Sequence, residues 1–507
     1  MLPFIHGVAE TYIDNERDLL PQCCFVFPNK RSATFFHHAY ARACNEKGLQ
    51  LIHPATVTIS DFILEMAHTV EPDRMEKIFL LYDAYCEIIM ENVRRDIKPE
   101  KLKSLLDFNH FLRWADMILG DFNDVDMYCV DPESIFPNVK RYKEISTNYV
   151  SADVMAEIQK HWKTSAGRYS TLDDRFWNHI GQGDGDAAQT ADFFRMWQIM
   201  LPLYRRFNEK LDSKGMSYNG KAYLRAIGYI DSTAAEDLPY RRYVFMGFNM
   251  VSDAEEKVFA LLRDKQAPVP LADFYFDDAS PVFNSRFIPG HGAAIAIKSL
   301  KKKFPSLYQG AVRPIGEFPK IEIIGIPSRV GQMKIAGEIV RSLYPRQLCA
   351  DALADASVAE DLKEQLRRTA IVLPQESMVK GVMSALPGWL PAVNFTMGYR
   401  LRDSSVASLV RDIVSMHHRS HISKAGVRTF FCEDVRKVLS HPLMLQYFQN
   451  ESQAIDRMLS IKHLFNVRPS DIVDLYPDLE PVFTFVGVNA SPEDVIAYFY
   501  KLTHWLG

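Results

Sequence analysis

An uninterrupted run of apolar residues, ended by a proline and followed by a polar turn, limits most strongly how this chain can fold. Residues 23–28 form such a run, after which residues 29–32 are polar and residues 33–43 have a helical pattern. Short continuous apolar runs are typical of strands buried on both faces of a parallel sheet. A second strand pattern at residues 56–59 runs into Ser60, which favours the start of another helix. The repetition of strand, turn and helix predicts an α/β fold.

Helical patterns then dominate from residue 61 to residue 225, and strand patterns return at residues 243–247 and 271–276. The simplest account is one α/β domain that is interrupted by a helical insertion. We therefore place the first part of the domain at residues 1–65, the insertion at residues 66–225 and the second part at residues 226–312.

A second α/β region follows a linker at residues 313–316, Arg-Pro-Ile-Gly. It is predicted to contain one helix, at residues 332–343, and three strands, at residues 321–326, 370–374 and 393–396. We assign residues 313–402 to this second domain and residues 403–507 to a helical insertion or tail.

Two α/β domains with helical insertions form the layout of superfamily-one helicases, in which two RecA-like domains enclose ATP and move along single-stranded DNA. The predicted fold class is therefore α/β, with two RecA-like, P-loop NTPase-like parallel-sheet domains and large α-helical insertions. Because one fold supports many activities, the chemistry of the sites has to decide the function.

Composition and charge exclude several classes of protein. Lys plus Arg number 59 and Asp plus Glu number 63, a net charge of −4, so any nucleic-acid site is a local patch. No run of 18 apolar residues predicts a transmembrane helix, and residues 1–10 lack the layout of a secretory signal. The seven cysteines have no C-x-x-C spacing and are odd in number. We expect a reduced cytoplasmic protein without membrane contact and without a cysteine-bound metal.

An ATP-driven motor needs a glycine-rich phosphate loop whose lysine reaches the phosphates and whose Ser or Thr binds magnesium. The near match runs from Gly215 to Lys221 and is followed by Ala222, which has no hydroxyl group. Residues 207–214 before it have the pattern of a helix end instead of the required buried strand. Residues 4–20, where a helicase would carry the loop, contain no G-K-S or G-K-T sequence. We interpret the near match as a turn between helices, with a nucleotide site as the alternative.

A motor also needs acidic residues at the end of a core strand, where they hold magnesium and orient water. The strand predicted at residues 243–246 ends instead in Gly247, Phe248 and Asn249, so this magnesium position is degenerate. Both ends of an ATP site are therefore missing, and we assign no catalytic residue.

Three sets of ligand-type side chains are too irregular for a metal site: residues 121–126; His417, His418 and His421; and Asp273, Asp277 and Asp278. The first resembles a calcium loop but has valine at its fifth position, no glycine at its sixth and proline at its twelfth. The histidines have no carboxylate at a fixed spacing, and the aspartates are typical of solvated groups at a strand end. We therefore assign no metal and no cofactor in this region.

Polar and basic residues at the predicted turns are the remaining candidates. Asn29, Lys30 and Arg31 follow the first core strand, at the edge where open α/β sheets bind ligands. Such groups can contact phosphates, and a solvated surface is the alternative interpretation. The other sets are Arg329, Gln332 and Lys334 after the first strand of the second domain, and Lys298, Lys301, Lys302 and Lys303 at a helix end.

Taken in order, five segments resemble those of AddB-type subunits of helicase–nucleases, in the branch of the family that lacks a phosphate loop. The segments are residues 25–31, 121–126, 244–249, 369–374 and 394–399, and the resemblance extends from about residue 20 to residue 443. It implies a subunit of an AddAB/RecBCD-like complex that processes double-strand DNA ends for recombination. An AddA-like partner would supply the ATP-driven motor.

The resemblance also implies roles for single residues. Asn29, Lys30 and Arg31 match the family's single-strand-contact motif, and residues 247–249 match the position of the lost magnesium-binding acids. The aromatic residues that could stack on bases are Phe248, Phe395 and Tyr399, although core burial is the favoured state for each.

The family pattern continues into a C-terminal PD-(D/E)XK nuclease, which holds an iron–sulfur cluster in many members. Neither an acid–acid–lysine set nor a cluster-like cysteine spacing occurs before Gly507. We therefore expect this chain to be the N-terminal part of a longer protein or a shortened form of one, and we assign no nuclease activity to this region. The predicted function is a non-catalytic, helicase-like scaffold that binds single-stranded or double-stranded DNA ends in double-strand-break repair. Two alternatives stay open: an active ATPase that uses the loop from Gly215 to Lys221, and a partner-docking module without DNA contact.

Overall fold

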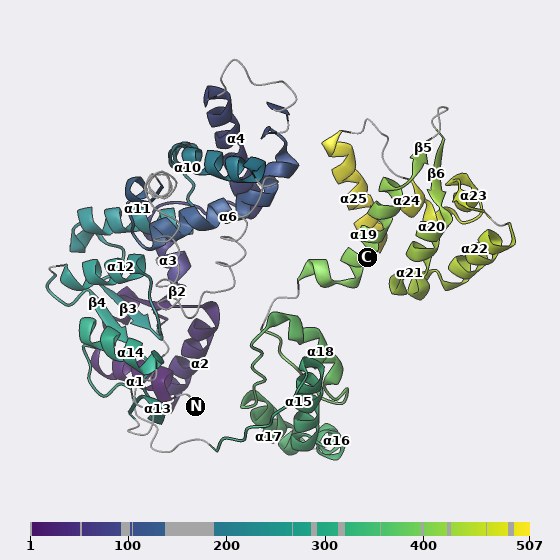
Figure 1. The fold of residues 1–507 in the computed structure, drawn as a ribbon. Helices are drawn as coiled ribbons and strands as arrows, with labels where there is room; N and C mark the ends of the chain where they lie inside the picture. Colours follow the sequence, from purple (N-terminus) through teal and green to yellow (C-terminus); the bar gives the residue numbers. More distant parts are fainter. Residues whose placement is uncertain are drawn as a thin grey trace, which may run out of the picture. The chain divides into compact units, whose positions relative to one another are not determined.

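The computed structural model describes residues 3–50, 53–92, 102–103, 105–136, 187–265, 267–284, 292–312, 320–354, 356–396, 400–422, 427–462, 464–484 and 491–506. The linker at residues 313–316 and residues 397–399, which include Tyr399, lie outside these ranges. The chain divides into two compact units, Met1–Ile321 and Glu322–Gly507 (Figure 1).

A four-stranded parallel sheet forms the centre of the first unit. Phe25 of β1 is aligned with Thr56 of β2 on one side and with Val244 of β3 on the other. Every residue of β1, β3 and β4 is buried, which explains their largely apolar sequences. The parallel α/β sheet expected from the sequence is therefore confirmed. The strand order is β2-β1-β3-β4, with β1 at Cys23–Phe27, β2 at Ala55–Thr58, β3 at Arg242–Met246 and β4 at Ala272–Tyr275.

Helices cover both faces of this sheet because alternate residues of a strand point to opposite sides. Phe25 lies in the apolar cluster of α1 (Pro3–Asn15) and α2 (Lys30–Glu46), whereas Val26 lies in the cluster of the other face. The helices of that other face are α3 (Ile59–Met66), α11 (Asn219–Ser232), α12 (Asp253–Asp264) and α14 (Gly292–Lys303).

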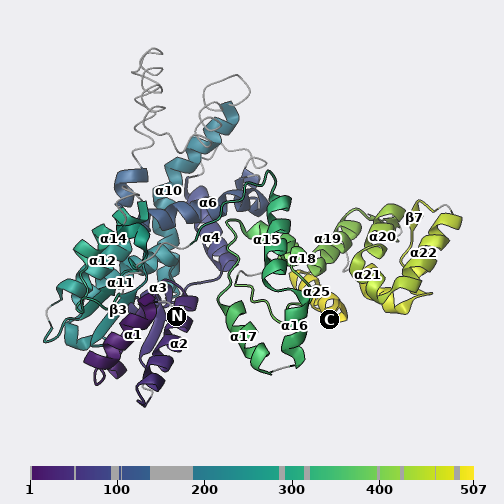
Figure 2. The same cartoon turned by 90° about the horizontal axis from the view of Figure 1, so that it is seen from below.

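Three of the helices between β2 and β3, namely α4, α6 and α10, share an apolar core of their own. Leu81 of α4, Phe122 of α6 and Phe207 of α10 are fully buried in one cluster. Figures 1 and 2 show these three helices grouped beyond the sheet, and α6 also packs against α11. Their bounds are Arg74–Asn92 for α4, Phe108–Met127 for α6 and Ala187–Ser213 for α10.

A buried polar network holds α1 against the sheet. The hydroxyl group of Tyr12 donates to the carboxylate of Asp273 in β4 at 2.6 Å, and Asp273 is fully buried. Arg242, at the start of β3, pairs with Glu16, which also accepts from Tyr308. Buried polar groups cost free energy unless they are paired, so these contacts fix where α1 lies.

The second unit begins with four helices. Val340, Tyr344 and Leu362 belong to a small core shared by α15, α16 and α17, and α18 packs against α15. The bounds are Arg329–Leu343 for α15, Arg346–Ala354 for α16, Ala356–Arg367 for α17 and Val379–Ala385 for α18.

The three strands predicted at residues 321–326, 370–374 and 393–396 are not formed, and this prediction is wrong. No residue in the described ranges pairs with these segments as a neighbouring strand. Their apolar side chains are exposed instead, with Ile323 at 91% and Val372 at 87%. An apolar run indicates only a local preference, whereas a parallel strand also needs a neighbouring backbone to complete its hydrogen bonds.

A small antiparallel sheet, β5-β6-β7, lies among the later helices of the second unit. The sequence predicts only helices in residues 403–507 and misses this sheet. Strands of two to four residues are too short to leave an alternating pattern. The strands are β5 (His421–Ile422), β6 (Arg428–Phe431) and β7 (Asn466–Val467), and the helices are α19 (Ser405–His418), α20 (Cys432–Leu439), α21 (Pro442–Tyr447), α22 (Gln449–Ile461), α23 (Ser470–Val473), α24 (Glu480–Phe483) and α25 (Pro492–Leu506).

Short elements connect these parts: α13 (Pro281–Asn284) and the 3-10 helices η1 (Leu20–Gln22), η2 (Ala235–Asp237), η3 (Glu376–Met378), η4 (Leu401–Asp403) and η5 (Pro477–Leu479). Within the described ranges, none of the helices has the length and apolar character needed to cross a membrane.

Candidate nucleic-acid interface

The strand order of the first unit creates a switch point between β1 and β3. From β1 the chain crosses to β2 on one side, whereas β3 and β4 extend the sheet on the other side. In open α/β sheets, ligands bind beyond the carboxyl ends of the two strands at such a point. The aligned pair of Val26 and Phe245 lies one residue from both ends, so residues 28–31 and 247–249 leave the sheet side by side. The fold thus brings together two of the sets singled out in the sequence.

Asn29 positions the helix that carries the two cations. Its side-chain oxygen accepts a hydrogen bond of 3.0 Å from the amide of Ser32, which makes it the N-cap of α2. Lys30 and Arg31 then occupy the exposed first turn of α2, and neither forms an ion pair with any described residue. Free amide groups and the helix dipole add partial positive charge at the same place. This corner of the unit is therefore suited to an anion.

The turn after β3 contributes backbone shape but no charge. Gly247 has a φ of +78°, which favours glycine, and its amide donates to the carbonyl oxygen of Tyr275 at 2.9 Å. Phe248 is only 3% exposed and its ring lies 5.4 Å from that of Phe259, so the favoured interpretation of Phe248 as a core residue is confirmed and it is not placed to stack on a base. Asn249 is exposed. Without a carboxylate at these three positions, the turn cannot hold magnesium as a motor strand does.

The loop that resembles a phosphate-binding sequence connects two helices, α10 and α11. Lys221 is 8% exposed, and its ammonium group donates to the carbonyl oxygen of Asn208 and pairs with Asp212, both at 2.7 Å. Burial lowers the pKa of Lys221, and the carboxylate of Asp212 opposes this shift. The lysine therefore points to protein groups, and the strand that precedes a phosphate loop is replaced by a helix.

The segment that resembles a calcium loop lies inside α6 and supports that same turn. The side-chain oxygen of Asn123 accepts from the amide of Gly220 at 2.9 Å. The buried carboxylate of Asp126 accepts from the hydroxyl groups of Tyr204 at 2.6 Å and Tyr218 at 2.5 Å. Burial raises the pKa of Asp126, and the two tyrosine hydrogen bonds oppose the rise. These side chains join α6 to α10 and to the start of α11.

The remaining acidic and histidine sets are dispersed. Asp273 is fully buried and accepts a hydrogen bond from Tyr12, so the expectation of a solvated acid is wrong for this residue. Asp277 accepts from the amide of Ala279, and Asp278 pairs with Lys301. A further cation of the lysine run, Lys303, pairs with Glu256.

His417 is buried in the second unit. Its Nε2 atom lies 2.8 Å from the carbonyl oxygen of Val482, whereas His418 and His421 are exposed. The three histidines therefore do not converge on one metal.

The second unit repeats the arrangement of proline, N-cap and cation that begins α2. Pro327 precedes Ser328, whose hydroxyl group accepts from the amide of Gly331 at 3.0 Å and caps α15. Arg329 and Lys334 are exposed on the first turns of α15, and Gln332 contacts the carbonyl oxygen of Ile326 at 3.5 Å. Phe395 is 43% exposed. The cap role of Asn29 and Ser328 was missed in the sequence, although their spacing to the helix start signals it.

Comparison with models of known protein families gives no match for this chain, and comparison with curated proteins gives none either.

Proposed function

We propose that this chain is a non-catalytic, helicase-like scaffold that binds single-stranded DNA within an AddAB/RecBCD-like helicase–nuclease acting in double-strand-break repair. The observation that carries the proposal is the switch point of the first unit. There, Lys30 and Arg31 stand exposed at a helix start beside a strand end without acidic residues. Exposed cations can bind a phosphate backbone, whereas ATP hydrolysis also needs acidic residues that hold magnesium.

Single-stranded DNA is the favoured ligand because phosphate contacts tolerate any sequence and exposed aromatic rings can stack on bases. Arg329 and Lys334 offer a second pair of exposed cations at the start of α15, and Phe395 offers a partly exposed ring. In this proposal the parallel sheet of the first unit belongs to a RecA-like domain, the second unit takes the place of the second RecA-like domain, and an AddA-like partner supplies the ATP-driven motor.

The two alternatives have less support. An ATPase that uses the loop from Gly215 to Lys221 would need the lysine to leave Asn208 and Asp212. A docking module without DNA contact would leave the exposed Lys30 and Arg31 without a role.

Fluorescence anisotropy with a labelled oligothymidine tests the proposal. The double variant Lys30→Ala and Arg31→Ala is expected to bind at least tenfold more weakly at low salt than the wild type, because two phosphate contacts are lost. The matched control is Lys301→Ala with Lys303→Ala, which removes the same charge from lysines already paired with Asp278 and Glu256. Equal weakening in both variants, or no binding by the wild type, would contradict the proposal.

A further inference from the structure

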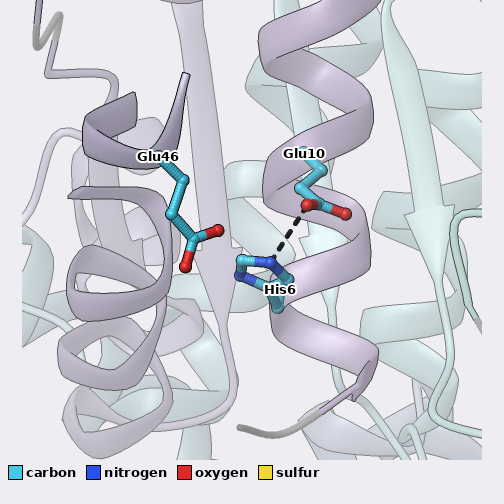
Figure 3. Close-up of side chains that lie close together, drawn as sticks. All are labelled: His6, Glu10 and Glu46. Atoms are coloured by element: carbon cyan, nitrogen blue, oxygen red, sulfur yellow. Dashed lines mark ion pairs between the residues drawn. The ribbon is translucent and has the colours of Figure 1, made fainter. Parts of the chain in front are cut away.

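Three potential metal ligands converge between α1 and α2, away from every set that the sequence suggested. His6 and Glu10 are four residues apart on α1, and the Nε2 atom of His6 lies 3.1 Å from a carboxylate oxygen of Glu10. Glu46 at the end of α2 supplies the third group. One ligand atom from each residue lies within 4.8 Å of the others, and Figure 3 shows the imidazole between the two carboxyl groups.

The burial of His6 supplies an independent reason to look for a cation here. His6 is 9% exposed, and its Nδ1 atom is buried without a hydrogen-bond partner among the described residues. A buried polar atom without a partner costs about 1–3 kcal/mol. A cation bound at Nδ1 and shared with the neighbouring carboxylates would give this nitrogen a partner and balance their charge.

The geometry points to a site for one divalent transition-metal ion of the zinc type, held by His6, Glu10 and Glu46. Zn²⁺ bonds to imidazole nitrogen and carboxylate oxygen are about 2.0–2.2 Å long, so two ligand atoms on one tetrahedral ion are about 3.3–3.5 Å apart. The three ligand atoms lie within 4.8 Å of one another, so small side-chain shifts bring them to this separation. An imidazole ligand favours zinc over magnesium or calcium, which prefer oxygen ligands only.

Glu46 can move into place at little cost. Its carboxyl side chain is 48% exposed and pairs with Arg42 at 2.7 Å, four residues earlier on α2. Exposed pairs of this kind contribute little free energy, so the ion can displace the guanidinium group. Arg42 is therefore both a competitor for Glu46 and a convenient probe of the site.

Once bound, the ion would join the two helices that cover one face of the sheet. Because the site draws on both α1 and α2, it would stabilise the folded state in proportion to its affinity.

Titration of the metal-free, untagged full chain with Zn²⁺, followed by calorimetry, tests the site. The wild type is expected to bind one ion, Glu46→Gln to weaken its affinity at least tenfold, and Arg42→Ala to strengthen it. The matched control is Glu236→Gln, which changes an exposed glutamate outside the cluster and is expected to bind as the wild type does.

Glu46 and Arg42 are exposed, so neither variant depends on refolding of the core. Absence of zinc binding at millimolar concentration would overturn the proposal, as would an affinity that is the same in the wild type, Glu46→Gln and Arg42→Ala. Either result would leave His6 and Glu10 as an ordinary ion pair.

Discussion

The ammonium group of Lys221 lies 2.7 Å from the backbone carbonyl oxygen of Asn208, one helix away across the turn between α10 and α11. This contact gives a structural role to a lysine that in sequence resembles the phosphate-contacting residue of an ATPase. Asn123 and Asp126 of α6 accept hydrogen bonds from the same turn and from the start of α11. Two segments that look like ligand sites in the sequence are therefore each other's packing partners.

Replacement of Lys221 by methionine is expected to destabilise the first unit by about 1–3 kcal/mol. Methionine preserves the unbranched side chain but leaves the Asn208 carbonyl oxygen without its donor. Asp212 keeps Arg225 as a partner, so its charge is not stranded. Urea unfolding measures the loss, and Lys214→Met, at an exposed lysine of the same turn, is expected to stay within about 0.5 kcal/mol of the wild type. Stabilisation of the wild type by magnesium–ATP that disappears in Lys221→Met would favour the ATPase instead.

Two glycines of α11 are expected to respond to alanine in opposite directions. A Cβ atom at Gly220 would lie 2.7 Å from the carbonyl oxygen of Asn123 and 2.8 Å from the Cβ of Asp126, so Gly220→Ala pushes α11 from α6. We expect a loss of about 1–3 kcal/mol. Gly228 has open space at the same position, and Gly228→Ala is expected to stabilise by about 0.5–1 kcal/mol. Thermal unfolding of the two variants compares them, and equal effects would contradict the close approach of α6 and α11.

The stability of the second unit is expected to fall when the pH is lowered from 6.5 to 4. Burial lowers the pKa of His417 from 6.5 to about 4, so the unfolded chain takes up the proton first and is stabilised relative to the folded chain as the pH falls. The neutral ring contacts Val482 through Nε2 and Arg428 through Nδ1. The full penalty below pH 4 is on the order of 3 kcal/mol, and it is absent above pH 6.5.

Thermal unfolding between pH 4 and pH 7 measures this dependence. His417→Gln removes the titrating group and is expected to flatten the profile, whereas His418→Gln changes its exposed neighbour and is expected to leave the profile unchanged. A profile that is the same in the wild type and in His417→Gln would contradict the assignment of the penalty to His417.

The parts of the fold that were predictable from sequence are those governed by local patterns. The predicted strand at residues 243–247 corresponds to β3, and that at residues 271–276 corresponds to β4, because strands buried on both faces must be apolar along their length. The exposed segments at residues 321–326 and 370–374 have the same apolar pattern but form no strand. Strand pairing depends on distant backbone, which a local pattern does not record.

The candidate site shows the same division. The basic character of Lys30 and Arg31 and the absence of acids at residues 247–249 are visible in the sequence. Their adjacency is not, because the strand order β2-β1-β3-β4 joins segments that lie more than 200 residues apart in the chain. The cluster with Glu46 is similar: the spacing of His6 and Glu10 is visible, but the crossing of α1 and α2 is not.

The most direct test of whether this chain binds DNA without using ATP is the salt dependence of oligothymidine binding, measured with and without magnesium–ATP. Each phosphate contact to a single strand contributes about 0.7 to the slope of log affinity against log salt. Lys30→Ala with Arg31→Ala is therefore expected to reduce the slope by about 1.4, and magnesium–ATP is expected to change neither slope nor affinity. An unchanged slope in the double variant, or an affinity that shifts on addition of magnesium–ATP, would contradict the account.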